Sequence, residues 1–296
     1  MEYGGFKMEV WRSMVKRIII LLFVFSSAYG QANRFAGFGQ RSTCPTEALK
    51  FIDSSGITNQ TEKDAICTLV KQLKDSSLWT SMLAIYPFVG GTASSSKWNL
   101  VNPVNSNSAF RLDFFGGWTF ASTGAKPNGV NAYAITYFVP INSWASDTSI
   151  SFGYYSTTNT SATQVEMGID AGLAGHILLE LNTSGTTYLR ANIPWVYSTT
   201  FADANSLGFY VGSRISSTQE KCFKNGVLKA TGVFTKLGFG VDSRPIYLAA
   251  WNKPPSTPLY YSSKNCTFSF IANGLTDAKI ATLYNIVLAF NTTLGR

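Results

Sequence analysis

The sequence is poor in charge and in histidine. Charged side chains occupy only 14 % of its 296 positions, against about 25 % in an average soluble chain. The single histidine, His176, excludes a metal site built from several imidazoles. The four cysteines show no C-x-x-C spacing, which argues against zinc and dithiol redox sites. Together these absences exclude a disordered polyampholyte, a coiled coil and an ordinary charge-rich cytosolic enzyme.

The chain also lacks an apolar run of the roughly 20 residues that a membrane span needs. Its one apolar run near the N-terminus, 18–25, is preceded by four basic residues and followed by the small residues Ala28 and Gly30. This order is typical of a secretory signal peptide cleaved before Gln31. We therefore expect 1–30 to be a signal and 31–42 a linker, with an uncleaved apolar anchor as the alternative. No stable transmembrane span is expected after cleavage, and the protein is expected to be extracellular or displayed on a surface.

The cysteines fit an exported chain. An even number of them, Cys44, Cys67, Cys222 and Cys266, favours disulfides in an oxidising compartment. We expect Cys44 to pair with Cys67 and Cys222 with Cys266, because each pair would then stay inside one structural region. Free buried thiols are the alternative.

The formal net charge of +8 is moderate and scattered. Lys221, Lys224 and Lys229 alternate along the chain and form no block like a nucleic-acid-binding arm. We expect no nucleic-acid partner. A polyanionic glycan or a cell surface would be attracted, although a merely soluble surface explains the charge equally well.

Residues 43–87 are predicted to be a small helical region. Thr43 is placed to cap a first helix, and a second begins near Asn59 or Thr61. The apolar residues between 66 and 73 follow the i, i+3, i+4, i+7 rule of an amphipathic helix. A third short turn is expected over 78–83. The apolar residues of this region exceed what one short bundle can bury, which predicts self-association.

From about residue 88 the pattern changes to short strands separated by polar turns. We expect strands over 110–115, 133–139, 150–155, 164–169, 176–181, 187–193, 207–211, 246–251 and 266–271. Regular spacing of this kind is typical of a β-sandwich. Asn225-Gly226 suits a type I′ hairpin turn. Thr276 opens a C-terminal helix over 276–290, whose apolar stripe is expected to pack in the core.

Residues 223–227, 245–250 and 273–284 resemble the concanavalin-like, laminin-G-type (LamG-like) jelly roll. In that family a strand ending in glycine runs into L-[ST]-[DE]-x-x-[IV]-x-x-L-Y, and residues 275–284 (LTDAKIATLY) match it position by position. The resemblance covers about 88–296. It implies a mainly β fold, a concanavalin-like jelly-roll β-sandwich with a small N-terminal helical region and a C-terminal helix.

A narrower resemblance concerns 85–93 (IYPFVGGTA), 97–100 (KWNL) and 110–118 (FRLDFFGGW). These segments are similar to proteins of tailed bacteriophages that carry a helical head before the same jelly roll and are usually regarded as virion structural proteins. The likeness implies a virion-surface component such as a head fibre, decoration or tail protein, with other virion or surface proteins as partners. The signal-like N-terminus departs from that family and implies a membrane-directed use.

Catalytic patterns in the sequence are weak. Glu166 and Asp170 come nearest to the E-x-D-x-E pattern of concanavalin-like glycosidases, but Gly168 stands at the central position. Their Cα atoms would lie about 13 Å apart on one strand, more than retaining or inverting hydrolases use. His176 lies beside an apolar strand and has no G-x-S-x-G partner. We predict a protein that is not an enzyme, with a glycoside hydrolase as the weakest alternative.

Calcium is the one metal that the LamG resemblance suggests, because such modules often hold an ion at the sandwich rim. Oxygen ligands would come from loop carbonyls and from Asp113, Asp147, Asp170, Asp203 and Asp242. No D-x-D-x-D-G cluster is present, and no other cofactor is expected.

Glycan binding is a more specific hypothesis than calcium binding. Sugars stack on aromatic rings, and four tryptophans lie in or beside the predicted strands: Trp118, Trp144, Trp195 and Trp251. Core packing is the alternative role for each of them. The sequence therefore predicts a non-catalytic structural or adhesion protein, most simply at a virion surface and contacting cell-surface glycans. A secreted bacterial lectin-like protein is the competing interpretation.

Overall fold

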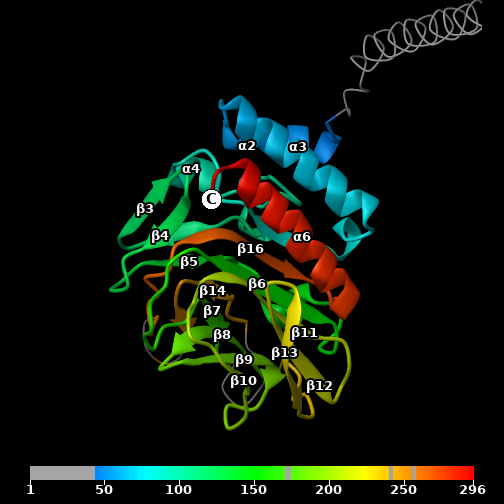
Figure 1. Ribbon diagram of the computed structural model, residues 1–296, viewed down its shortest axis with the longest axis vertical. Coiled ribbons are helices and arrows are strands. Elements are labelled where there is room, and N and C mark those ends of the chain that lie inside the picture. The colour runs from blue at the N-terminus through cyan, green and yellow to red at the C-terminus, as the bar shows by residue number, and fades with distance from the viewer. Residues whose placement is uncertain (1–43, 171–174, 240–242, 254, 256–257) are drawn as a thin grey trace, which may run out of the picture. The chain divides into compact units, whose positions relative to one another are not determined.

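The chain folds as a mainly β sandwich with helices on one side (Figure 1). A computed structural model describes residues 44–170, 175–239, 243–253, 255 and 258–296. Thr43, the predicted signal at 1–30 and the predicted linker at 31–42 lie outside these residues. Two sheets of eight strands enclose an apolar core to which Phe152, Leu179 and Ile271 contribute. The predicted class, a sandwich with a C-terminal helix, is confirmed, and its two sheets are consistent with a jelly roll.

Sheet A holds the longest antiparallel pairings. In spatial order its strands are β13 (Val227–Val233), β12 (Gln219–Lys224), β11 (Gly208–Arg214), β6 (Ile150–Ser156), β16 (Cys266–Ala272), β4 (Gly124–Pro127) and β3 (Trp118–Ala121). The eighth strand, β1 (Met82–Tyr86), also pairs with β16. The two central strands, β6 and β16, are buried along almost their whole length.

Sheet B combines two strands of eight residues with six strands of two to four residues. Their order is β10 (Thr199–Ala202), β9 (Thr186–Ile193), β8 (His176–Thr183), β7 (Met167–Ile169), β14 (Tyr247–Leu248), β5 (Tyr133–Ile135) and β2 (Asp113–Phe115). The remaining strand, β15 (Trp251–Asn252), pairs in parallel with β7. Alternate residues of these strands point into the core and away from it, which gives sheet B an outer face.

Three long helices cover the outer face of sheet A. They are α2 (Thr46–Ser55), α3 (Gln60–Asp75) and α6 (Asp277–Thr293). Helix residues such as Leu69 and Leu283 share one apolar cluster with Phe209 and Phe268 of the sheet. Short helices α4 (Ala93–Ser96) and α5 (Pro140–Ser143) and the 3-10 turns η1 (Trp79–Ser81) and η2 (Asn107–Ala109) lie in the connections. In the described part of the chain no helix is long and apolar enough to cross a membrane.

The predicted turn and the caps of α3 and α6 are confirmed, whereas α2 begins after Pro45 without a side-chain cap and the predicted cap, Thr43, lies outside the described residues. Asn225 and Gly226 both have positive φ, 52° and 73°, as a type I′ turn requires between β12 and β13. Asn59 caps α3 by accepting a hydrogen bond from the backbone N–H of Glu62. Thr276 caps α6 in the same way through Lys279. The predicted helix boundaries therefore hold to within a few residues.

The prediction of a helical region over 43–87 is wrong at its end. After η1 the chain enters β1, whose residues pair with β16 in sheet A. Four of the five residues of β1 are buried. A strand buried on both faces shows a continuous apolar run, and such a run cannot be told from a buried helical turn by periodicity alone.

One disulfide prediction is confirmed and the other is wrong. Cys44 and Cys67 are bonded, with Cα atoms 4.9 Å apart, and tie the start of α2 to α3. Cys222 and Cys266 are free and buried. They lie on β12 and β16, which are separated by β11 and β6. Three strand spacings amount to about 14 Å, roughly twice the Cα separation that a disulfide can span. Burial raises the pKa of both thiols.

Candidate functional site

The outer face of sheet B is the candidate site. The three long helices pack on sheet A, and Figure 1 shows sheet B on the side of the sandwich away from them. Several residues that point outward from sheet B or lie beside it are aromatic, and Arg190 among them is basic. We call six of these rings the outer aromatic row: Phe115, Tyr133, Tyr247, Trp251, Tyr260 and Trp195.

One half of the row is a stack of two indoles and a phenol. Trp195 follows β9 and is 47 % exposed, whereas Trp251 in β15 is 1 % exposed. Their ring centroids lie 4.7 Å apart with planes 13° from parallel. Tyr260 stacks on Trp251 at 5.9 Å. Gly168 of β7 makes room for the buried indole, because a Cβ at that position would lie 3.3 Å from Trp251 Cδ1.

The other half of the row crosses β2, β5 and β14. Phe115 and Tyr133 are direct cross-strand partners, and their rings stack with centroids 4.9 Å apart. Tyr133 and Tyr247 stack at 5.1 Å. Tyr247 and Trp251 both pair with Gly168 of β7, so the two halves meet at this glycine. The row therefore extends over most of the width of sheet B.

Two cations flank the Trp195 end of the row. The guanidinium carbon of Arg190, on β9, lies 4.2 Å from the centroid of the Trp195 ring. Its Nε donates a 2.9 Å hydrogen bond to the carbonyl of Tyr197. Lys253 Nζ lies 4.6 Å from the Trp251 centroid and 5.5 Å from that of Trp195. Cations at these distances are attracted to indole rings and also make this end of the face positive.

Polar groups lie under the same end. His176 begins β8, is buried, and its Nδ1 lies 3.2 Å from Asp170 Oδ1. Its ring meets the edge of Trp195 at 5.7 Å. The Nε1–H of Trp251 is buried and has no acceptor among the described residues. Because this nitrogen has almost no exposed surface, Trp251 supports the row from below and does not offer its N–H to a ligand.

The four predicted tryptophans separate into two groups. Trp195 and Trp251 come together in the outer aromatic row. Trp118, on β3, is partly buried against Phe114, and its Nε1 donates to backbone carbonyls. Trp144 is 4 % exposed in the core between the sheets, where its Nε1 donates to the carbonyl of Ala272. Its ring faces Phe239 at 5.5 Å and cannot meet a sugar.

The predicted calcium ligands do not converge. Asp113 pairs with Arg111, Asp147 with Lys236 and Asp203 with Lys224, while Asp170 lies beside His176. Although burial opposes it, hydrogen bonds from Arg111 and Tyr137 lower the pKa of Asp113. Asp242 lies outside the described residues. Within the described ranges no three carboxylate, imidazole or thiol side chains group together to hold a metal ion.

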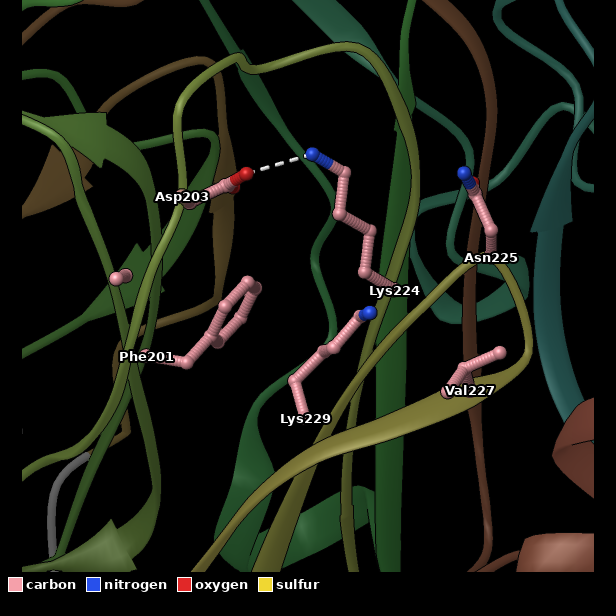
Figure 2. A pocket seen from close by; sticks show the side chains of 7 residues that line it. Phe201, Asp203, Lys224, Asn225, Val227 and Lys229 are labelled. Carbon is pink, nitrogen blue, oxygen red and sulfur yellow. Dashed lines mark hydrogen bonds and ion pairs between the residues drawn. The ribbon is translucent and has the colours of Figure 1, made fainter.

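Asp203 instead lies in the wall of a hollow of about 410 Å³ beside the β12–β13 hairpin (Figure 2). Lys224 Nζ reaches Asp203 Oδ1 at 2.6 Å, and Tyr210 donates to the other carboxylate oxygen at 2.7 Å. Phe201 and Lys229 complete much of the lining. The charges of Asp203 and Lys224 are already satisfied by each other, so the hollow offers a ligand little that is unpaired.

Glu166, the carboxylate considered for glycoside hydrolysis, is also held by partners within the protein. Glu166 and its partner Lys264 are both fully buried, with Oε1 and Nζ 3.0 Å apart. Glu166 further accepts from Ser262 and from the backbone of Leu181. Burial raises the pKa of Glu166, and Lys264 opposes the rise. A carboxylate held in this way has no open side toward a sugar.

Sequence reasoning missed most of this face. It singled out Trp195 and Trp251 but not Arg190, Lys253 or the row from Phe115 to Tyr247. A usable signal is the alternation in β9, where outward Tyr188 and Arg190 interleave with buried Leu189 and Ala191. The convergence of β2, β5 and β14 has no such signal, because it depends on which strands become neighbours.

No family model and no curated protein sequence matches the chain. Solved structures do resemble it. Domain 4 of AbnA, an extracellular GH43 arabinanase from Geobacillus stearothermophilus in complex with arabinotriose, aligns with TM-score 0.46 and 16 % identity over 69 % of this chain and 98 % of that one. Trypanosoma rangeli sialidase aligns with TM-score 0.47 and 11 % identity over 75 % of this chain and 38 % of its own length.

A third neighbour is the CBM40 domain of Ruminococcus gnavus IT-sialidase bound to α2,6 sialyllactose. It aligns with TM-score 0.34 and 17 % identity over 45 % of this chain and 81 % of that one. At these levels of similarity, the ligand of a neighbour does not establish a ligand for this chain. The candidate site therefore rests on its own geometry.

Proposed function

We propose that the chain is a non-catalytic adhesion protein that binds a glycan along the outer aromatic row of sheet B. The observation that carries the proposal is a file of six rings on the sheet face opposite the helices, ending at the half-exposed Trp195. Aromatic rings contact the apolar C–H faces of sugars, and polar groups beside them select the hydroxyls. Arg190 and Lys253 supply such polar groups at the Trp195 end.

The shape of the row favours an extended ligand. Its two halves lie on separate strands and meet at Gly168, so several sugar units of one chain can contact rings at once. A short segment, 259–261, joins the halves, because Tyr260 stacks on Trp251 while Tyr261 lies 6.5 Å from Tyr133. Contact spread over several rings accumulates affinity from individually modest interactions.

The absence of catalysis is part of the proposal. It is supported by the burial of Glu166 against Lys264, which leaves that carboxylate unable to approach a glycosidic bond. No cluster of carboxylates among the described residues supports the expectation of calcium. A binding assay run with added calcium chloride and with a chelator tests whether a metal contributes.

The setting is proposed to be extracellular. The Cys44–Cys67 disulfide supports this, because such bonds form and persist in oxidising compartments. A virion surface and a bacterial secretion product are the two settings that the sequence resemblance implies. Mass spectrometry of purified phage particles and of culture supernatant from the source distinguishes them: the chain is expected in the particles under the first and free in the supernatant under the second.

The proposed function is tested on an array of immobilised oligosaccharides that includes neutral hexose, neutral pentose and uronic-acid chains. We expect at least one chain to be retained, and Trp195→Ala to weaken that binding about tenfold, equivalent to about 1.4 kcal/mol. Val196→Ala is the matched control, because its side chain is 78 % exposed in the same loop. Retention of no sugar, or equal binding by the Trp195→Ala variant, would refute the proposal.

A further inference from the structure

Arg190 differs from the other buried cations of the chain. Lys264 pairs with Glu166 at 3.0 Å, Arg214 with Glu220 at 3.5 Å and Lys224 with Asp203 at 2.6 Å. Arg190 is only 8 % exposed, yet no carboxylate of the described residues lies within ion-pair distance of it. A buried charge is costly unless an opposite charge or hydrogen bonds compensate it.

The surroundings of Arg190 supply little of that compensation. Its Nε donates to one carbonyl, and its two terminal nitrogens donate to no described acceptor. Those nitrogens are also not sealed from solvent. Burial is the main influence that lowers the pKa of Arg190, and Glu180 and Glu220 oppose it only from beyond contact distance. Glu220 is already held by Arg214, Thr199 and the backbone of Ala191.

A second cation without a described carboxylate lies on the same end of the row. Lys253 Nζ lies within 5.5 Å of both indole centroids, and no acidic side chain of the described residues pairs with it. The guanidinium of Arg190 therefore lies against the Trp195 ring, and the ammonium of Lys253 lies near both indoles. Two cations without a described carboxylate partner, beside the half-exposed Trp195, form a complement to a negative charge on the ligand.

We propose that the Trp195 end of the outer aromatic row binds an anionic sugar residue, whose carboxylate or sulfate ester is held by Arg190 and Lys253. This inference rests on the proposed function and adds the class of its ligand. A guanidinium presents parallel N–H donors that match the oxygens of such a group. The rest of the row then contacts the neighbouring units of the same chain.

The test compares one sugar chain with and without its charge. Isothermal titration calorimetry is run with oligogalacturonate and with its methyl ester, and a sulfated galactan oligosaccharide is the second anionic source. We expect at least one anionic chain to bind ten times or more tightly than the neutral ester. That preference should shrink as sodium chloride is raised, because salt screens charges at the surface.

Variants assign the preference to the two cations. Arg190→Gln and Lys253→Gln should each reduce the ratio of anionic to neutral affinity several-fold. Lys126→Gln, an exposed lysine on β4 of the other sheet, should leave the ratio unchanged. Lys253 is partly exposed and its replacement is not expected to disturb folding, so the test stands even if Arg190→Gln fails to fold.

The outcomes separate this inference from the proposed function. Trp195-dependent binding of neutral and anionic chains with equal affinity would refute the inference and leave the proposed function in place. Failure of the natural chain to bind any of the sugars would refute both this inference and the proposed function. Binding to phosphatidylserine vesicles that Arg190→Gln abolishes, without binding to anionic sugars, would assign the cations to a membrane surface and overturn the inference.

Discussion

At the scale of single residues, the sandwich contains charges that water cannot reach. Glu166 and Lys264 have no exposed surface, and their interaction is completed by Ser262 and the backbone of Leu181. Replacing both partners of such a pair often changes stability little, whereas removing one leaves an uncompensated buried charge. The pair is therefore a sensitive point of the fold although it lies away from the outer aromatic row.

Lys264→Met is expected to lower the free energy of unfolding by about 3–5 kcal/mol at pH 7. Burial already raises the pKa of Glu166, and loss of Lys264 raises it further. A carboxyl whose folded pKa is raised binds more protons when folded, so its unfavourable contribution grows as pH rises. The loss should therefore be smaller at pH 4.5 than at pH 7 in urea unfolding.

The double variant Glu166→Gln/Lys264→Met is the control for this prediction. It removes both charges, so its stability relative to the natural chain should change much less with pH between 4.5 and 7. A Lys264→Met variant that loses the same free energy at both pH values would show that Lys264 does not influence the protonation of Glu166 in the folded chain between pH 4.5 and 7.

At the scale of elements, the sequence predicts structure well where local chemistry decides it. The Asn225-Gly226 turn, the Asn59 and Thr276 caps and the periodicity of α3 are each encoded within a few residues. All nine predicted strands overlap observed ones. Of the missed strands, β1 was predicted to be helical, while β3, β4 and β10 have only four residues each and β4 contains both Gly124 and Pro127. Such segments form strands because a neighbour is present rather than through their own propensity.

The β12–β13 turn provides a prediction at this scale. Gly226 has φ 73°, and a Cβ there would lie 3.0 Å from the Cβ of Tyr284 in α6. Gly226→Ala is therefore expected to cost more than the roughly 1–2 kcal/mol of a left-handed alanine alone. Gly56→Ala is the matched control, because Gly56 has φ 66° with nothing within 4 Å. If the two variants lose the same free energy of unfolding in thermal unfolding, the methyl group added at 226 does not clash with Tyr284 of α6.

At the scale of the whole molecule, the candidate site could be predicted only in part. Trp195 and Trp251 are recognisable as aromatic residues beside strands, yet nothing local distinguishes them from Trp144 in the core. The distinction arises from pairing: Trp251 lies over Gly168, and Arg190 points outward because Leu189 points in. The error over Cys222 and Cys266 has the same origin, since strand order decides which residues meet. Contacts between distant segments therefore limit what this sequence reveals.

The helical layer and the sandwich are expected to unfold as one unit. Leu69 of α3 is buried in the cluster that also contains Phe209 and Phe268 of sheet A, so neither layer keeps its core without the other. Leu69→Ala should lower the free energy of unfolding by about 2–5 kcal/mol. Circular dichroism at 222 nm, which reports the helices, and tryptophan fluorescence, to which four indoles of the sandwich contribute beside Trp79 and Trp98, should shift together with coincident midpoints.

Leu49→Ala is the matched control for that shift, because Leu49 lies on α2 with 47 % of its surface exposed, and it should change the midpoint little. Loss of the helical signal before any change in fluorescence would mean that the helices are a separate unit resting on sheet A. A single transition would instead mean that the helices and both sheets unfold cooperatively, so that contacts between the helices and sheet A also stabilise sheet B. The stability of sheet B, which carries the outer aromatic row, would then depend on the helices that pack on sheet A.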